Sequence, residues 1–142
     1  MKGKHGVRME NLRKLLSYLD GQKIKYTVID ERRVAFEIDL GGETEVRLIL
    51  YGRGETFTLF CWFMQESAAL PLSKKLMLCN TLNENLRWVC FYVDQQQDIS
   101  ASMDLAYAGL ENWEKHCWQQ ITRMAKIMAE ASCEMKAAIN GA

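Results

Sequence analysis

Residues 72–105 read LSKKLMLCNTLNENLRWVCFYVDQQQDISASMDL, and the rest of the chain is arranged around this stretch. Residues 72–85 have apolar side chains at helical spacing, which predicts a helix. Residues 86–93 and 99–105 are rich in β-formers, which predicts two strands. The stripe that we expect this helix to bury consists of Leu72, Leu76, Cys79, Leu82 and Leu86.

The order of elements in this stretch carries a family resemblance. A helix ending in Cys79-Asn80-Thr81-Leu82-Asn83 leads into a strand at residues 88–93. The acidic turn 94–98 then leads to a strand that closes on Asp104-Leu105. This order resembles the YbjN-like family of small bacterial proteins, whose fold is akin to that of type III secretion chaperones. The resemblance implies a sensory transduction regulator, and it supplies no catalytic residues to carry over.

The flanking sequence predicts the remaining elements. Turn residues at Gly41-Gly42 and Gly52–Glu55 separate alternating segments, which favours successive antiparallel hairpins. We therefore expect an α+β fold with an antiparallel sheet of about six strands and helices packed on it, in the order α-β-β-β-β-α-β-β-α. We expect residues 9–142 to form one domain, preceded by a basic flexible tail at residues 1–8. The expected elements outside the central stretch are a helix at residues 9–19, strands at 24–29, 33–40, 44–51 and 56–64, and a helix at 110–139.

The two faces of the predicted sheet differ. One face is apolar throughout and is expected to form the core; its members are Val34, Phe36, Ile38, Val46, Leu48, Leu50, Phe57, Leu59, Cys61 and Phe63. The other face becomes apolar along the chain, and a strand that is apolar on both sides should be covered on both sides. Three coverings stay open: the helix at residues 72–85 with a homodimer mate, this helix alone, or another protein. The aromatic residues that we predict at a partner or dimer surface are Phe60, Trp62, Trp88 and Tyr92.

Two asparagines at the end of the second helix admit two interpretations. Asn80 and Asn83 are three residues apart and share a face beside the apolar stripe. Their amides either satisfy backbone groups at the helix end and in the turn that follows, or act as polar anchors for a ligand. With Tyr92 they would define a small-molecule pocket between the sheet and the second helix.

The last helix is long for the predicted sheet. Thirty residues at about 1.5 Å per residue span roughly 45 Å, more than strands of six to eight residues cover. Its final third therefore projects, bends back or pairs with a neighbour. Its methionines either fill the core or form an adaptable binding surface.

Composition argues against several classes of protein. The 142 residues include 18 basic and 18 acidic side chains, whereas a dedicated nucleic-acid binder carries a basic footprint. The longest apolar run, residues 57–64, is too short to span a membrane, and residues 1–8 lead into no apolar segment typical of a secretory signal. Five cysteines without paired short spacings favour a reducing cytosol.

No pattern typical of catalysis or metal binding is found. His116 and Cys117 are adjacent, so on a helix their side chains diverge by about 100°. The cysteines fall on or near apolar stripes, and Cys133 is the best candidate for an exposed thiol. We expect no metal, no cofactor and no enzymatic activity. The sequence favours a cytoplasmic protein-binding, chaperone-like or regulatory module that acts as a homodimer and docks a partner segment; the alternative is a small-molecule-sensing domain.

Overall fold

The computed structural model describes residues 9–41, 45–61, 67–107 and 109–140. The predicted tail at residues 1–8 and the predicted strand residues Trp62 to Met64 lie outside them. The elements are α1 (Glu10–Gly21), β1 (Thr27–Val28), β2 (Arg33–Asp39), β3 (Glu45–Arg53), β4 (Thr56–Cys61), α2 (Leu72–Asn85), β5 (Cys90–Val93), β6 (Ile99–Ala106) and α3 (Trp113–Asn140).

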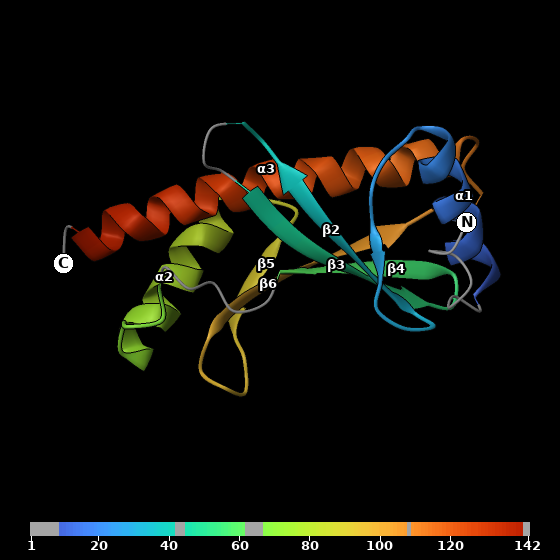
Figure 1. Cartoon of the computed structure of the whole chain (residues 1–142). Coiled ribbons are helices and arrows are strands. Elements are labelled where there is room, and N and C mark those ends of the chain that lie inside the picture. Colours follow the sequence, from blue (N-terminus) through green and yellow to red (C-terminus); the bar gives the residue numbers. More distant parts are fainter. Residues whose placement is uncertain (1–8, 42–44, 62–66, 108, 141–142) are drawn as a thin grey trace.

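The six strands form one antiparallel sheet in the order β1-β2-β3-β4-β6-β5. The first four strands follow one another as a meander, because short turns join strands that are adjacent in sequence. After α2 the chain returns so that β6 pairs with β4, which leaves β5 at the sheet edge (Figure 1). The predicted α+β class and element order are confirmed.

The core lies between one face of the sheet and the helices α1 and α3. Val34 pairs with Leu50, and Leu50 pairs in turn with Leu59, so the predicted apolar sets align across the strands. The rings of Phe36 and Trp118 are 5.7 Å apart, which places α3 on this face. Figure 1 shows α3 running along the sheet and beyond its end. Four leucines of α1 join this core: Leu12, Leu15, Leu16 and Leu19.

Two predicted strands are shorter than expected. The first was expected at residues 24–29, but Ile24 N–H bonds to the carbonyl of Leu19 and the Tyr26 hydroxyl bonds to Asp20, so this segment stays tied to the end of α1. The fifth was expected at residues 86–93, but it begins at Cys90. The alternation of apolar and polar side chains does not show where the turn before a strand ends and pairing with the next strand begins.

Helix α2 buries only part of the expected stripe: Cys79, Leu82 and Leu86 are buried, as predicted. Its buried residues are Lys75, Leu78, Cys79 and Leu82, whereas Leu72 and Leu76 are 43% and 50% exposed. The helix contacts β5 and α3, so it packs at the sheet edge rather than over the second sheet face. Leucines lie on more than one side of α2, and its contacts with β5 and α3 determine which of them are buried.

Candidate functional site

The edge of β6 is open beyond the end of β5. The β5–β6 pairing stops at Cys90 and Ser102, but β6 continues to Ala106. Backbone groups of an antiparallel strand alternate between its two neighbours. Asn83 bonds to the N–H and C=O groups of Phe91 on the side of β5 that faces away from β6, so the neighbouring Cys90 and its partner Ser102 direct these groups toward each other. Asp104 and Ala106 therefore direct their N–H and C=O groups to the same side of β6 as Ser102, where β5 no longer covers them. Among the described residues no other strand pairs with this side of β6 at residues 103–106.

A groove of about 330 Å³ lies along this open edge. Its floor is strand β6, and one wall is α3, whose lining residues His116, Gln120 and Arg123 follow one another at helical spacing. We call it the edge groove, and its lining consists of Trp88, Met103, Asp104, Leu105, Ala106, His116, Gln120 and Arg123.

Trp88 lines this groove with an exposed side chain and a strained backbone. Its side chain is 72% exposed, and its backbone has a φ of 82°, a left-handed conformation that costs a non-glycine residue about 1–2 kcal/mol. The guanidinium carbon of Arg123 lies 5.4 Å from the ring centroid, within the range of a cation–π contact. A cation–π contact at an exposed site is worth about 0.5–1 kcal/mol, so it does not fully offset the backbone strain.

Of the four aromatic residues predicted at a partner surface, the three that the structure describes do not lie together. Phe60 and Cys90 both pair with Ser102, and Tyr92 pairs with the next position but one on β6, so Phe60 and Tyr92 share the second sheet face. Both are half-buried, and burial, followed by the charges of Asp94 and Cys90, raises the pKa of Tyr92. Trp88 lies instead beside α3, and Trp62 lies outside the described residues.

Asn83 hydrogen-bonds to backbone groups on the outer edge of β5. Its amide Nδ2 donates to the carbonyl of Phe91 at 2.9 Å, and its Oδ1 accepts from the Phe91 N–H at 2.7 Å. One side chain thus makes both hydrogen bonds that a neighbouring strand would make at this position. Asn80 is exposed and does not reach this strand. Asn83 therefore has a structural task, while the predicted role of Asn80 and Tyr92 as ligand anchors stays a prediction.

The β5–β6 turn is organised by Asp94, for which the sequence alone indicated only a place in an acidic turn. Its Oδ1 accepts from the N–H groups of Gln96 and Asp98 at 2.9 and 3.0 Å, and its Oδ2 accepts from the Ser100 hydroxyl at 2.8 Å. Burial raises the pKa of Asp94, but these hydrogen bonds and the charge of Lys75 outweigh it, so the pKa lies below the ordinary value.

Lys75 joins this turn to α2 and was not expected in the core. Its side chain is only 6% exposed, and its Nζ donates to the carbonyl of Gln97 at 2.7 Å. A buried ammonium group needs such partners because its desolvation is costly. The sequence carries a weak signal for this role, since Lys75 precedes Leu78, Cys79 and Leu82 at helical spacing on the same side of α2.

The five cysteines differ in burial: Cys79 and Cys117 are buried, and Cys61 is half-buried. Burial, and to a lesser extent the charge of Glu114, raises the pKa of Cys117 to about 12. Burial also raises the pKa of Cys79, with a smaller electrostatic contribution from Cys90. Such thiols are protonated at neutral pH and are weak nucleophiles. Cys133 is exposed, as expected, and so is Cys90. Within the described residues, no three His, Cys, Asp or Glu side chains come together as metal ligands.

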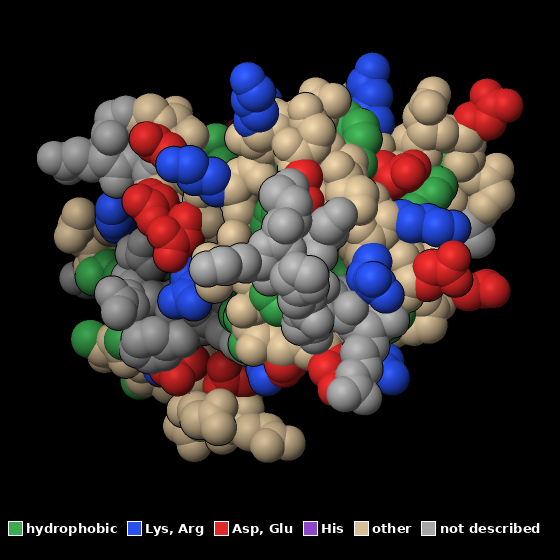
Figure 2. Space-filling view, turned by 45° about the vertical axis from the view of Figure 1, so that its right-hand side comes forward, with side chains coloured by type: hydrophobic (Ala, Val, Ile, Leu, Met, Phe, Trp, Pro, Cys, Tyr) green, Lys and Arg blue, Asp and Glu red, His purple; other side chains and the backbone are tan. Residues whose placement is uncertain are grey.

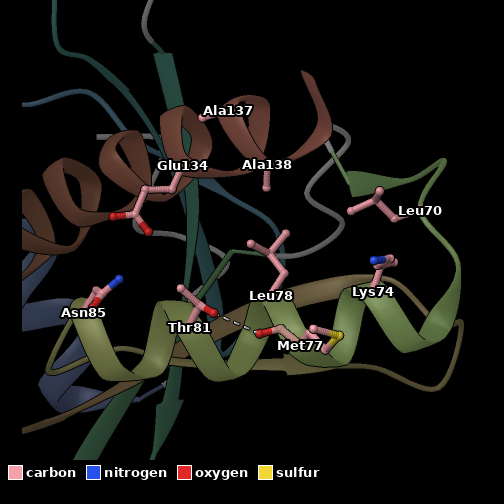
Figure 3. Close-up of a pocket in the computed structure, with 9 residues that line it drawn as sticks. All are labelled: Leu70, Lys74, Met77, Leu78, Thr81, Asn85, Glu134, Ala137 and Ala138. Atoms are coloured by element: carbon pink, nitrogen blue, oxygen red, sulfur yellow. Dashed lines mark hydrogen bonds between the residues drawn. The ribbon is translucent and has the colours of Figure 1, made fainter. Parts of the chain in front are cut away.

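A second groove, of about 500 Å³, lies between α2 and the C-terminal end of α3. Figure 3 shows the two helices running in opposite directions, with the lining side chains between them. We call it the helix groove, and its described lining consists of Leu70, Lys74, Met77, Leu78, Thr81, Asn85, Glu134, Ala137 and Ala138.

The surface charges are mixed. Figure 2 shows acidic and basic side chains interspersed on one face of the molecule, in keeping with the equal numbers of the two kinds. A phosphate-binding surface instead gathers Lys and Arg on one side. None of the helices in the described part of the chain has both the length and the apolar character that a membrane span requires.

The sequence also matches a protein-family model. The model is YbjN, described as "Putative bacterial sensory transduction regulator", and it matches residues 11–114. The chain belongs to the YbjN family. The resemblance predicted from the helix end and the two strands after it is thereby confirmed. In this YbjN-family chain the matched region includes Trp88 and all of β6, whereas the α3 wall of the edge groove and the α3 side of the helix groove follow it.

A solved YbjN structure has the same fold. It is a crystal structure of "YbjN, a putative transcription regulator from E. coli", with a TM-score of 0.59 and 15% sequence identity. The similarity covers 89% of this chain and 92% of that chain. At this identity the likeness to the E. coli YbjN concerns the fold alone. The search of curated proteins found no match.

Proposed function

We propose that this YbjN-family chain is a non-enzymatic regulatory module that binds an extended segment of a partner protein in the edge groove. One observation carries the proposal: β6 offers an unpaired edge at residues 103–106 directly beside an exposed Trp88. We place this activity in the cytoplasm, where free thiols such as Cys90 and Cys133 stay reduced.

The open edge would supply affinity through the backbone. A segment added to β6 hydrogen-bonds to the outward N–H and C=O groups of Asp104 and Ala106, whatever its sequence. The segment would lie beside residues 103–106 of β6, a position that β5 leaves empty. Strand β5 begins only at Cys90, and Trp88 just before it has a left-handed backbone. Long exposed strand edges are normally covered or blocked, as Asn83 blocks β5 at Phe91.

Side chains along the groove would supply selectivity. Trp88 presents a large rigid ring that can pack on an apolar side chain of the segment, and such aromatic anchors dominate interface energies. The polar groups of His116 and Gln120 lie on the α3 wall, within the same lining. A backbone strain retained at an exposed tryptophan is typical of functional positions, which supports a binding role for Trp88.

The alternative function, small-molecule sensing between the sheet and the second helix, has less support. Asn83 already has both amide groups bonded to Phe91. The helix groove, which borders α2, is lined by neither Asn80 nor Tyr92. A ligand would therefore have to use anchors other than those that the sequence suggested.

The test is quantitative recovery of partners from a lysate of the native bacterial host, followed by binding of overlapping partner peptides to the purified protein. Trp88→Ala removes the anchor, and Ala106→Pro removes one outward N–H group. Proline is tolerated at strand edges where this group faces away from the sheet. Both variants should retain the wild-type circular dichroism spectrum and weaken peptide binding, with a loss of about 30-fold for the tryptophan, or 2 kcal/mol.

Leu72→Ala is the matched control, because Leu72 is also an exposed apolar side chain but lies on α2, outside the edge groove. It should bind the same peptides as the wild type. If all three variants bind peptide equally well, the edge groove is not the binding site. If no peptide or partner binds the wild type, the proposed function is wrong.

A further inference from the structure

The helix groove carries exposed apolar surface on both helices. Met77 is 62% exposed on the α2 wall, and Ala137 and Ala138 line the α3 wall, so a closely packing helix could be accommodated between them. Leu78 lies at the base of the groove and belongs to the main core. The groove is therefore a shallow apolar surface between two antiparallel helices, rather than a polar cleft suited to catalysis (Figure 3).

Opposite charges mark the two ends of the groove. Lys74 lies toward the N-terminal end of α2, and Glu134 lies on α3 toward the other end, beside Asn85 (Figure 3). They are the two ionisable residues of the described lining, so the lining has no net charge. A strongly acidic partner would be repelled by Glu134, and a strongly basic partner would be repelled by Lys74.

We propose that a second copy of this chain docks on the helix groove through a two-fold symmetric interface. A two-fold axis that runs across the two helices reverses the direction of the groove. The end of the groove that carries Lys74 in one copy then lies against the end that carries Glu134 in the other copy. Because the interface is symmetric, this pairing of opposite charges occurs twice. The apolar surfaces around Met77 face one another at the centre, where methionine adapts its shape readily.

This inference does not rest on the proposed function, because it concerns another surface. Arg123 of the edge groove and Glu134 of the helix groove are eleven residues apart on α3, or about 16 Å along the helix. Docking at one groove therefore leaves room for a segment at the other. A dimer would present two edge grooves, so a partner with two suitable segments would bind more tightly than one with a single segment.

Sedimentation velocity and multi-angle light scattering over a range of protein concentrations test the interface. The wild type should be a dimer at micromolar concentration. Lys74→Glu or Glu134→Lys should raise the dimer dissociation constant about tenfold or more, since each creates two like-charge contacts. Combining the two substitutions restores opposite charges and should return the dissociation constant to near the wild-type value.

Two further variants separate the groove from the rest of α2. Met77→Glu places a charge at the apolar centre and should give a monomer, while Leu76→Glu, at an exposed residue outside the groove lining, should leave the dimer intact. Circular dichroism confirms that both are folded. A monomeric wild type would overturn the inference, and so would a dimer that neither the charge reversals nor Met77→Glu weakens.

Discussion

At the scale of single residues, the least expected features are a strained tryptophan and an aspartate that organises a turn. Trp88 has a left-handed backbone, which is unfavourable for a non-glycine residue, and an exposed ring that contributes little burial. Asp94 receives hydrogen bonds from three directions and holds the β5–β6 turn in place. The sequence pointed to Trp88 as a binding residue, but it placed this residue in a strand, because backbone strain leaves no mark on side-chain periodicity.

Glycine should be tolerated better than alanine at position 88. Trp88→Ala loses the contact with Arg123 and retains the left-handed strain, whereas Trp88→Gly loses both. We expect the glycine variant to be more stable than the alanine variant by about 1 kcal/mol, measured by urea unfolding. Neither variant should bind peptide well. An alanine variant at least as stable as the glycine variant would show that position 88 is not strained.

The turn at Asp94 should make stability depend on pH in the acidic range. The pKa of Asp94 is lowered in the folded state, so its contribution is fully present above the ordinary carboxyl pKa of about 4 and is lost as pH falls through the lower folded value. Asp94→Asn should therefore be less stable than the wild type at pH 7. The difference in free energy of unfolding should shrink below about pH 4. A difference that is constant from pH 7 to pH 2 would contradict this account.

At the scale of elements, α2 completes the sheet edge as well as the core. Lys75 bonds to the β5–β6 turn, and Asn83 bonds to the backbone of β5, so the helix is joined to the last hairpin at two points. The helix boundaries could be predicted at residues 72–85, because apolar spacing and Pro71 are local signals. Its buried side could be predicted only in part. Cys79, Leu82 and Leu86 are buried as expected, but Leu72 and Leu76, which match the same pattern, are exposed, and Leu78 is buried instead.

Removing the Asn83 amide should destabilise the fold and expose the β5 edge. Asn83→Ala leaves the N–H and C=O groups of Phe91 without their partner, at a cost of about 1–3 kcal/mol. Asn80→Ala, at the exposed asparagine three residues earlier, is the matched control and should change stability by less than about 0.5 kcal/mol. Thermal unfolding and light scattering would measure stability and edge-driven aggregation. Equal effects of the two substitutions would rule out an edge role for Asn83.

At the scale of the whole molecule, α3 connects two surfaces that are separate in space. Its N-terminal half forms a wall of the edge groove, and its C-terminal end forms a wall of the helix groove. Buried methionines at positions 124, 128 and 135 belong to the core, as the core-filling interpretation of this helix expected. The helix extends beyond the sheet to reach α2, which explains its length (Figure 1).

The two grooves should act independently. Sites more than about 10 Å apart without shared partners usually contribute additively. Trp88→Ala should weaken peptide binding and leave the dimer dissociation constant unchanged, and Met77→Glu should do the reverse when binding is expressed per subunit. Isothermal titration calorimetry on the two single variants and the double variant measures both quantities. Loss of both properties in either single variant would show that the grooves are coupled.

The sequence by itself determined the class, the order of elements and the face of the sheet that forms the core. These follow from period-2 and period-3.6 patterns and from turn residues, which act over a few neighbouring positions. Only the tertiary structure decided where β5 begins, which residues in the first half of α2 are buried, and that Trp88 lies beside an open stretch of β6. Each of these depends on contacts between segments far apart in the chain, and local periodicity is equally satisfied by the alternatives that packing rejected.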